Sequence, residues 1–277
     1  MSTIGLARAA EVRLSFRGLV ESERIKLLSR VSTFWGAGII AAMMISMAAT
    51  MGFEADQAHA LTPAAVAGMA TGGVVGAQFA AIVLGAFAIT GEYRTGQIRS
   101  TFNADPRRTQ VLAAKAVVIA AAGFLATLAS SILALIVAHV LLALRGVDAG
   151  LLTVESVRML FGAAAYIAAV AVMSLACGAA LRRSAPAITA VLGILWALPG
   201  TAVMLPEGVV GTIVSFLPSS AGSALYTSTS SAGPSIFSEM TPASAVTLAP
   251  WSGLLILLAY LTVIWAVGSA VTRRRDA

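Results

Sequence analysis

Charged side chains with a suggestive spacing are concentrated in one short segment between two long apolar windows. Its central stretch reads Glu92-Tyr93-Arg94-Thr95-Gly96-Gln97-Ile98-Arg99-Ser100-Thr101-Phe102. Ile98 and Phe102 stand four positions apart, so in a helix they would share one face and dock an apolar pair onto another surface. On its residues alone, the segment fits either a short docking helix or a solvated basic loop.

Motifs for catalysis are missing from the chain. It contains no GxxxxGK[ST] phosphate loop, no HExxH pair for a zinc ion and no GxSxG serine elbow. We therefore expect no enzyme activity, no metal and no bound cofactor in this chain. His139 and Cys177 are most simply interpreted as packed side chains, because a functional ionisable group inside a membrane normally has a partner.

The composition is that of a membrane protein. Of the 277 residues, 58% are hydrophobic and only 11% are charged, whereas soluble domains carry about 25% charged residues. Windows of about 18 or more apolar residues mark membrane-spanning helices, and six are present without a central charge. We predict a single all-α transmembrane domain with spans at residues 32–51, 66–90, 116–144, 159–181, 187–205 and 251–272.

Lys and Arg are distributed very unequally between the two sides that these spans define. One side carries 16 of the 18, in the N-terminal arm 1–31, the loop 91–115, the Arg182-Arg183 pair and the C-terminal tail. Because cytoplasmic loops retain positive charge, both termini are predicted to be cytoplasmic. The net charge of +6 then reflects topology and gives little reason to expect nucleic-acid binding.

The spans lack the carboxylates that ion-driven carriers commonly use near the middle of the bilayer. Gln78 and scattered Ser and Thr are the polar side chains available there. If the chain moves a substrate uphill, the energy is expected to come from another subunit that engages the cytoplasmic face.

The N-terminal arm is predicted to form an amphipathic surface helix. Phe16, Val20, Leu27 and Val31 fall in one sector at 100 degrees per residue. Such a helix lies in the headgroup region with its basic side chains towards anionic lipid, although a simple topogenic anchor explains the charge equally well. The adjoining face carries Glu23, Lys26 and Arg30.

Together these segments resemble the permease subunits of bacterial ATP-binding-cassette exporters of the type-2 class. The resemblance rests on Ser22-Glu23-Arg24-Ile25-Lys26-Leu27 before a span that bears Trp35, and on an E-x-R-x-G stretch that begins at Glu92. It continues with Pro106-Arg107-Arg108 and with Lys115 at the entry to the third span. It follows the six-helix layout and is specific mainly over residues 91–115, where Gln97 stands in the place of a common Thr.

The resemblance implies a membrane protein of the bacterial inner membrane that works with two separate cytosolic ATPase subunits and a second permease copy, as a homodimer or with a related partner. ATP and Mg would be bound by the ATPases. The loop after the second span would be the coupling element, and Gly96 would allow a close approach at a helix edge. The implied coupling residues are Glu92, Arg94, Gly96, Ile98, Arg99 and Phe102, and the implied interface residues of the N-terminal helix are Glu23, Lys26, Leu27 and Arg30.

Two further patterns concern the outer face and the helix contacts. Residues 206–250 contain five prolines and no Lys or Arg, so no single long helix crosses them. The resemblance implies a re-entrant pair of short helices here, as an outer gate, and an ordinary Ser/Thr-rich loop is the alternative.

The four-residue spacing of Gly68, Gly72 and Gly76 predicts a small-residue seam for close helix packing.

Three functions remain open from the sequence. The first is the permease subunit of an ATP-driven exporter for an amphiphilic or apolar compound such as a lipid, drug or peptide. The second is a stand-alone secondary carrier or channel, and the third is a membrane anchoring or assembly protein.

Overall fold

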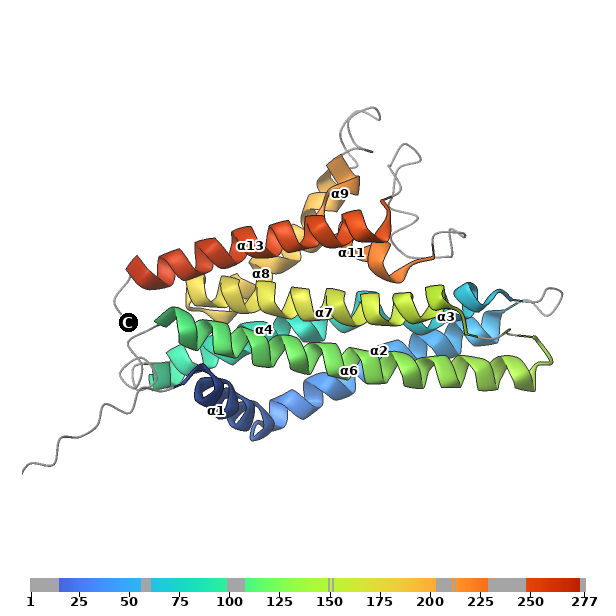
Figure 1. The fold of residues 1–277 in the computed structure, drawn as a ribbon, viewed down its shortest axis with the longest axis horizontal. Coiled ribbons are helices and arrows are strands. Elements are labelled where there is room, and N and C mark those ends of the chain that lie inside the picture. The colour runs from blue at the N-terminus through green and yellow to red at the C-terminus, as the bar shows by residue number, and fades with distance from the viewer. Residues whose placement is uncertain are drawn as a thin grey trace, which may run out of the picture.

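The computed structural model describes residues 15–55, 61–98, 108–148, 150, 152–202, 211, 213–228 and 248–274. Every regular element in these ranges is a helix (Figure 1). Six helical segments are long and apolar enough to cross a membrane. The prediction of an all-α membrane protein with six spans is therefore confirmed.

The six predicted spans correspond to helices that extend beyond most of the apolar windows. The first, third and fourth are α2, α6 and α7; the second consists of α3 and α4; the fifth comprises α8, the π-helical segment η1 and α9; the sixth is α13. The bounds are α1 Phe16–Leu28, α2 Val31–Glu54, α3 Pro63–Thr71, α4 Val74–Thr95, α6 Arg108–Leu144, α7 Val154–Leu181, α8 Ser184–Leu192, η1 Gly193–Ala197, α9 Leu198–Ala202, α11 Pro218–Tyr226 and α13 Pro250–Arg274.

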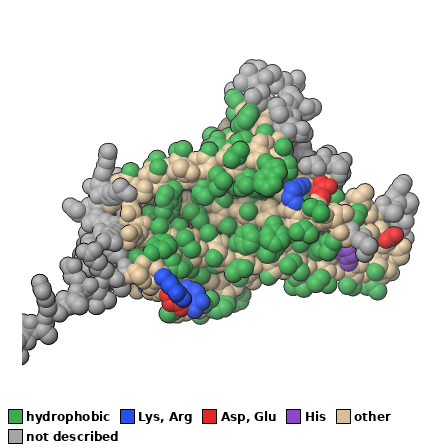
Figure 2. All heavy atoms as spheres, viewed as in Figure 1, with side chains coloured by type: hydrophobic (Ala, Val, Ile, Leu, Met, Phe, Trp, Pro, Cys, Tyr) green, Lys and Arg blue, Asp and Glu red, His purple; other side chains and the backbone are tan. Residues whose placement is uncertain are grey.

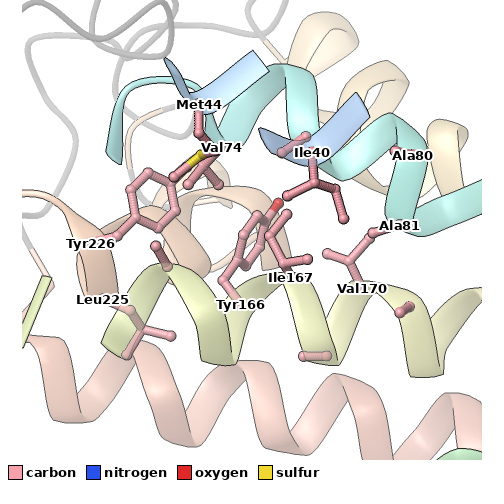
Figure 3. Packing of buried hydrophobic residues seen from close by; sticks show 14 of the residues in the cluster. Ile40, Met44, Val74, Ala80, Ala81, Tyr166, Ile167, Val170, Leu225 and Tyr226 are labelled. Atoms are coloured by element: carbon pink, nitrogen blue, oxygen red, sulfur yellow. The ribbon is translucent and has the colours of Figure 1, made fainter. Parts of the chain in front are cut away.

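The long helix α7 lies in the middle of the bundle. It packs against α4, α6 and α13, and it also touches α3, α8 and α11. Figure 3 shows Tyr166, Ile167 and Val170 of α7 directed towards side chains of α2 and α4. The two ends of the bundle are named here by their short helices: the α1 end, where α4 ends and α6 begins, and the α11 end (Figure 1).

The second span is interrupted near the α11 end of the bundle, which hydropathy alone does not reveal. The helix stops at Thr71 and restarts at Val74, so that Gly72 and Gly73 form a turn. A Cβ on Gly73 would overlap the backbone of Met43 and Met44 in α2. The interruption therefore lies where the two backbones are in close contact.

The three glycines of the predicted seam do not all face one helix. Gly72 and Gly76 lie against methionine side chains of α2, and a Cβ on Gly76 would come within 2.9 Å of Met43 Sδ. A Cβ on Gly68 would instead lie 3.9 Å from the Cε atom of Met159 in α7. All three contacts are within the chain.

The fifth span changes its winding just before Pro199. Residues Gly193–Ala197 form a π-helical segment, and α9 follows it. A proline ring clashes with the carbonyl of the residue four positions earlier, here Leu195, and a wider turn relieves that clash. The backbone therefore accommodates Pro199 through a π segment that precedes the proline.

Two arginines hold helix ends at the α11 end of the bundle. Arg158 of α7 donates to the carbonyl oxygens of Leu225 at 2.9 Å and Thr227 at 2.8 Å, at the C-terminal end of α11. Arg145 donates to the carbonyl of Phe53, near the end of α2. Positive charge is favourable at helix C-termini, so both arginines at this end have a structural role.

The short helix α11 is the described part of the predicted gate 206–250. It packs against α7 and α13, and Gly222 lies directly against the ring of Tyr166. Ile213–Ser215 form a short helical stretch before it. The remaining residues of the predicted gate, apart from Gly211, Phe216, Leu217, Thr227, Ser228 and 248–250, lie outside the described ranges.

The close contact of α4 with α7 should depend on Gly85. A Cβ there would overlap the carbonyl oxygen of Ala171, a backbone atom that cannot rotate away. We expect Gly85→Ala to lower the free energy of unfolding by about 1–3 kcal/mol, visible as a lower thermal denaturation midpoint in mild detergent. Gly91→Ala is the matched control on the same helix, since a Cβ at Gly91 meets no described atom within 4 Å. Equal midpoints for the two variants would contradict this account of the packing.

Candidate functional site

A buried group of charges joins α1, α4 and α6 at the α1 end. We call it the charge cluster; it consists of Glu23, Lys26, Arg30, Glu92 and Lys115. On the face drawn in Figure 2, charged side chains gather towards the ends of the molecule, and the surface between them is largely hydrophobic. The cluster brings together residues from the arm, the end of the second span and the start of the third.

Lys115 is the centre of the charge cluster. Its Nζ atom lies 2.5 Å from Glu23 Oε2 and 2.7 Å from Glu92 Oε1. Lys115 and Glu23 are almost completely buried, and the side chain of Glu92 is fully buried. One ammonium group therefore bridges two carboxylates from different helices, at a depth where an unpaired charge would be very costly.

Lys26 and Arg30 surround this centre on its more open side. Lys26 donates to Glu23 Oε1 at 2.7 Å, one turn earlier on α1. Lys26 and Arg30 each lie 3.8 Å from Glu92 Oε1. Their side chains are 29% and 34% exposed, so the basic residues form the boundary between the buried pair and the surroundings.

The environment of Glu23 favours its ionised form. Burial raises the pKa of this carboxyl, but the charge of Lys115 and hydrogen bonds from Lys115 and Lys26 outweigh burial, and the pKa is lowered. Glu92 differs in that its second oxygen, Oε2, is buried and accepts no hydrogen bond from the described residues. Among the described residues, both carboxylate oxygens of Glu23 accept hydrogen bonds, whereas only one oxygen of Glu92 does.

An apolar cluster next to these charges fixes the end of α4. Leu19 of α1, Val111 and Ala114 of α6, and Ile98 are buried together, with Val20 and Tyr93 beside them. Ile98, one member of the predicted apolar pair, is thereby docked onto α1 and α6 within the chain. Phe102 and Arg99, its predicted companions, lie outside the described residues.

The accessible part of the segment is the last two residues of α4 and the two that follow, Arg94–Gln97, which we call the exposed turn. Arg94, Thr95, Gly96 and Gln97 are exposed, whereas the residues on either side are held in the protein. Gly96 ends α4 with φ of 72°, a left-handed conformation that favours glycine. Within the described residues a Cβ on Gly96 would meet nothing within 4 Å, so the close approach expected at Gly96, which concerns a partner chain, stays a prediction.

A cation over an aromatic ring connects this end of α4 with the end of α7. The guanidinium carbon of Arg182 lies 5.5 Å from the centre of the Tyr93 ring. Arg182 itself ends α7 with φ of 58°. One member of the predicted basic pair Arg182-Arg183 therefore helps to hold the α1 end together.

The structure shows which residues of the N-terminal helix face the bundle. Leu19 and Glu23 are its buried residues, whereas Phe16 is 46% exposed and Val31, the residue that begins α2, is 70% exposed. The helical pattern puts Glu23 on a face next to lipid, but in the structure this residue points into the bundle. The amphipathic pattern gave no sign that a carboxylate would bind a lysine 92 positions away.

Sequence reasoning also missed the central role of Lys115, which it placed only at the entry to the third span. The signal that could have revealed it is its position directly before a charge-free window of 29 residues. A lysine there either reaches the headgroups or is paired inside the protein. The two carboxylates on neighbouring segments favoured the second outcome.

Two polar groups within the spans also have defined neighbours. Gln78 is buried in α4 and accepts a hydrogen bond from Tyr166 at 2.8 Å, while its Nε2 atom has no partner among the described residues. His139 is half-buried and lies 3.0 Å from the carbonyl oxygen of Leu135 in its own helix. Within the described part of the chain, no three His, Cys, Asp or Glu side chains are grouped as they would be around a metal ion.

Comparison with known proteins adds no family to these observations. No protein-family model and no curated protein matches the chain.

Removal of Lys115 should be more damaging than removal of an exposed cation. Lys115→Met leaves Glu23 and Glu92 buried without their shared partner, and breaking a buried pair costs about 3–5 kcal/mol. We expect a strongly lowered denaturation midpoint in detergent, whereas Arg24→Met, which removes an exposed cation of α1, should have little effect. Addition of Glu92→Gln to Lys115→Met should restore part of the loss; strict additivity of the two changes would argue against a shared charge cluster.

Acid should release α1 from the bundle. Because the pKa of Glu23 is lowered in the folded protein, its ionised form stabilises the fold at pH values above its ordinary pKa of 4.5, and this stabilisation is lost as the pH falls through the lower folded value. Hydrogen exchange of the α1 amides, corrected for the intrinsic rate, should increase steeply on acidification below that ordinary value. In Glu23→Gln the α1 amides should exchange faster at neutral pH and change less with acid; an unaltered profile would refute the assignment.

Proposed function

We propose that this chain is the membrane-spanning permease subunit of an ATP-binding-cassette exporter, driven by separate cytosolic ATPase subunits. The observation that carries the proposal is the combination of an exposed turn at Arg94–Gln97 with the buried charge cluster directly behind it. Six spans without a central carboxylate fit a subunit that receives its energy from a partner. The E-x-R-x-G stretch from Glu92 supplies the resemblance.

The charge cluster gives the exposed turn a firm attachment. Glu92 lies two residues before Arg94, the first residue of the turn, and is bound to Lys115 of α6, which in turn holds Glu23 of α1. A force applied to the turn would therefore move the ends of α1, α4 and α6 together. In this proposal Glu92 transmits motion from inside the protein, and Arg94 is the residue that touches the ATPase.

The remaining parts of the proposal concern orientation and assembly. The excess of Lys and Arg at the α1 end favours a cytoplasmic location for this end, in a bacterial inner membrane. The fifth and sixth spans are the least buried in the chain, at 22% and 11% of their apolar windows, so they have surface to offer to a second permease copy. ATP and Mg would be bound by the two ATPases, and the substrate would be an amphiphilic or apolar compound leaving the cell.

The proposal is tested by purification of the intact complex. The chain is captured from its native membrane in mild detergent, and bound proteins are identified by mass spectrometry. We expect an ATPase with a phosphate loop in a stoichiometric amount, and its loss in Arg94→Glu, because the change reverses the charge of the exposed turn. Arg99→Glu tests the predicted residue beyond the described part of the turn.

Glu54→Arg is the control, since it reverses a charge of the same size on an exposed residue at the α11 end. It should retain the ATPase. If the wild-type chain retains no ATPase under conditions that preserve a known complex, the exporter assignment fails. Transport driven by an ion gradient without ATP would then support a carrier, with Gln78 and His139 as the next residues to change, and no transport at all would support an anchoring or assembly protein.

A further inference from the structure

The open side of the charge cluster has basic groups whose hydrogen-bonding capacity is largely unused. A guanidinium group has five N–H donors and an ammonium group has three. Among the described residues, the carboxylate nearest to Arg30 is at 3.8 Å, beyond hydrogen-bond distance. Lys26 makes one short hydrogen bond, to Glu23. Both side chains are about one-third exposed.

These two side chains line a shallow hollow together with other polar and apolar residues. The hollow is shallow, and its empty space of about 230 Å³ includes the open solvent in front of it. Glu23 and Lys115 lie at its polar side, and Leu27, Ala88, Val118 and Ile119 supply its apolar side. Such a combination of cations and apolar carbon suits a molecule with an anionic head and a hydrocarbon part.

The charge cluster carries one net positive charge. Lys26, Arg30 and Lys115 bring three positive charges, and Glu23 and Glu92 bring two negative charges. A phosphodiester carries one negative charge and oxygen acceptors that match a guanidinium fork. Its binding would make the group neutral.

The neighbouring surface indicates that the anion belongs to a lipid. Val31, Phe34 and Trp35, which follow Arg30 at the start of α2, are 61–71% exposed. Exposed Trp and apolar residues next to basic side chains are typical of the headgroup level of a membrane. A free inorganic phosphate would use the basic groups and leave this apolar surface without a partner.

We propose that this hollow binds the phosphate of an anionic phospholipid, with Lys26 and Arg30 as its ligands and Leu27 and Val118 beside the first acyl carbons. The lipid would hold α1 against α4 and α6 from outside, where the charge cluster holds them from inside. The site requires only that the α1 end lies at a membrane surface, so it does not depend on the proposed transport function.

The test measures lipid binding to the full chain. Protein purified in mild detergent is titrated with phosphatidylglycerol or phosphatidylcholine, and bound lipids are counted by native mass spectrometry. We expect tighter binding of phosphatidylglycerol, with a loss of about tenfold in affinity for Arg30→Gln, the size that corresponds to one charge-assisted contact. Arg24→Gln is the matched control: it removes the same charge from an exposed position of α1 that is paired with Glu21, and it should retain the wild-type affinity.

Two further arms distinguish a lipid site from a free-phosphate site and from a loss of folding. Arg30→Lys keeps the charge and should bind more strongly than Arg30→Gln, and equal denaturation midpoints without lipid would show that both variants are folded. Inorganic phosphate should not displace phosphatidylglycerol. Equal losses in Arg24→Gln and Arg30→Gln, displacement by inorganic phosphate, or no preference for phosphatidylglycerol over phosphatidylcholine would each overturn the proposal.

Discussion

The arrangement of the α1 end depends on the need to neutralise charge at the edge of an apolar bundle. Lys115 enters a helix whose next 29 residues carry no formal charge, and Glu92 ends another span with its side chain fully buried. Both groups are shielded from bulk water, so each requires an opposite charge at contact distance. Glu23 supplies the additional carboxylate, which places α1 against α6. The position of a short amphipathic helix, usually set by lipid alone, is thereby fixed by the spans themselves.

The rest of the bundle is held by close backbone contacts. In lipid, helices gain little from burying apolar side chains against one another, so association relies on small residues that let the backbones approach. Gly85, Gly162 and Gly178 place α4, α7 and α11 where a Cβ would overlap a neighbour. Contacts of this kind tolerate little sliding. A movement of α4 would therefore carry α7 with it, which is the behaviour expected of a rigid element between the two ends of the protein.

The amino-acid pattern was sufficient to predict the number of spans and the all-α class, because a long charge-free window has few alternatives to a membrane-spanning helix. It was less informative about helix ends. The predicted third span begins at Ala116, after the last charge, whereas α6 is already helical at Arg108. Charge stops a hydropathy window but does not stop a helix, provided that the side chain is paired or reaches the interface. The break at Gly72 and Gly73 escaped prediction for a similar reason, since hydropathy does not record backbone geometry.

The partners within the candidate site were harder still to predict, because helical periodicity assigns a polar face to water by default. In α1 that face meets Lys115, so Glu23 becomes one of the two buried residues of the helix.

The two ends of the bundle use different chemistry to hold their short helices, and the difference bears on which end can respond to its surroundings. At the α11 end, Arg158 binds backbone carbonyl oxygens, which carry no titratable proton. At the α1 end, the joint is made by carboxylates and basic side chains, and its open side presents Lys26 and Arg30. Acid acts directly on the carboxylates of the α1 joint, whereas the carbonyl oxygens bound by Arg158 do not titrate; the titratable group beside Arg158 is Glu155, at 3.6 Å. The α1 joint therefore depends more on ionised side chains than the α11 joint does.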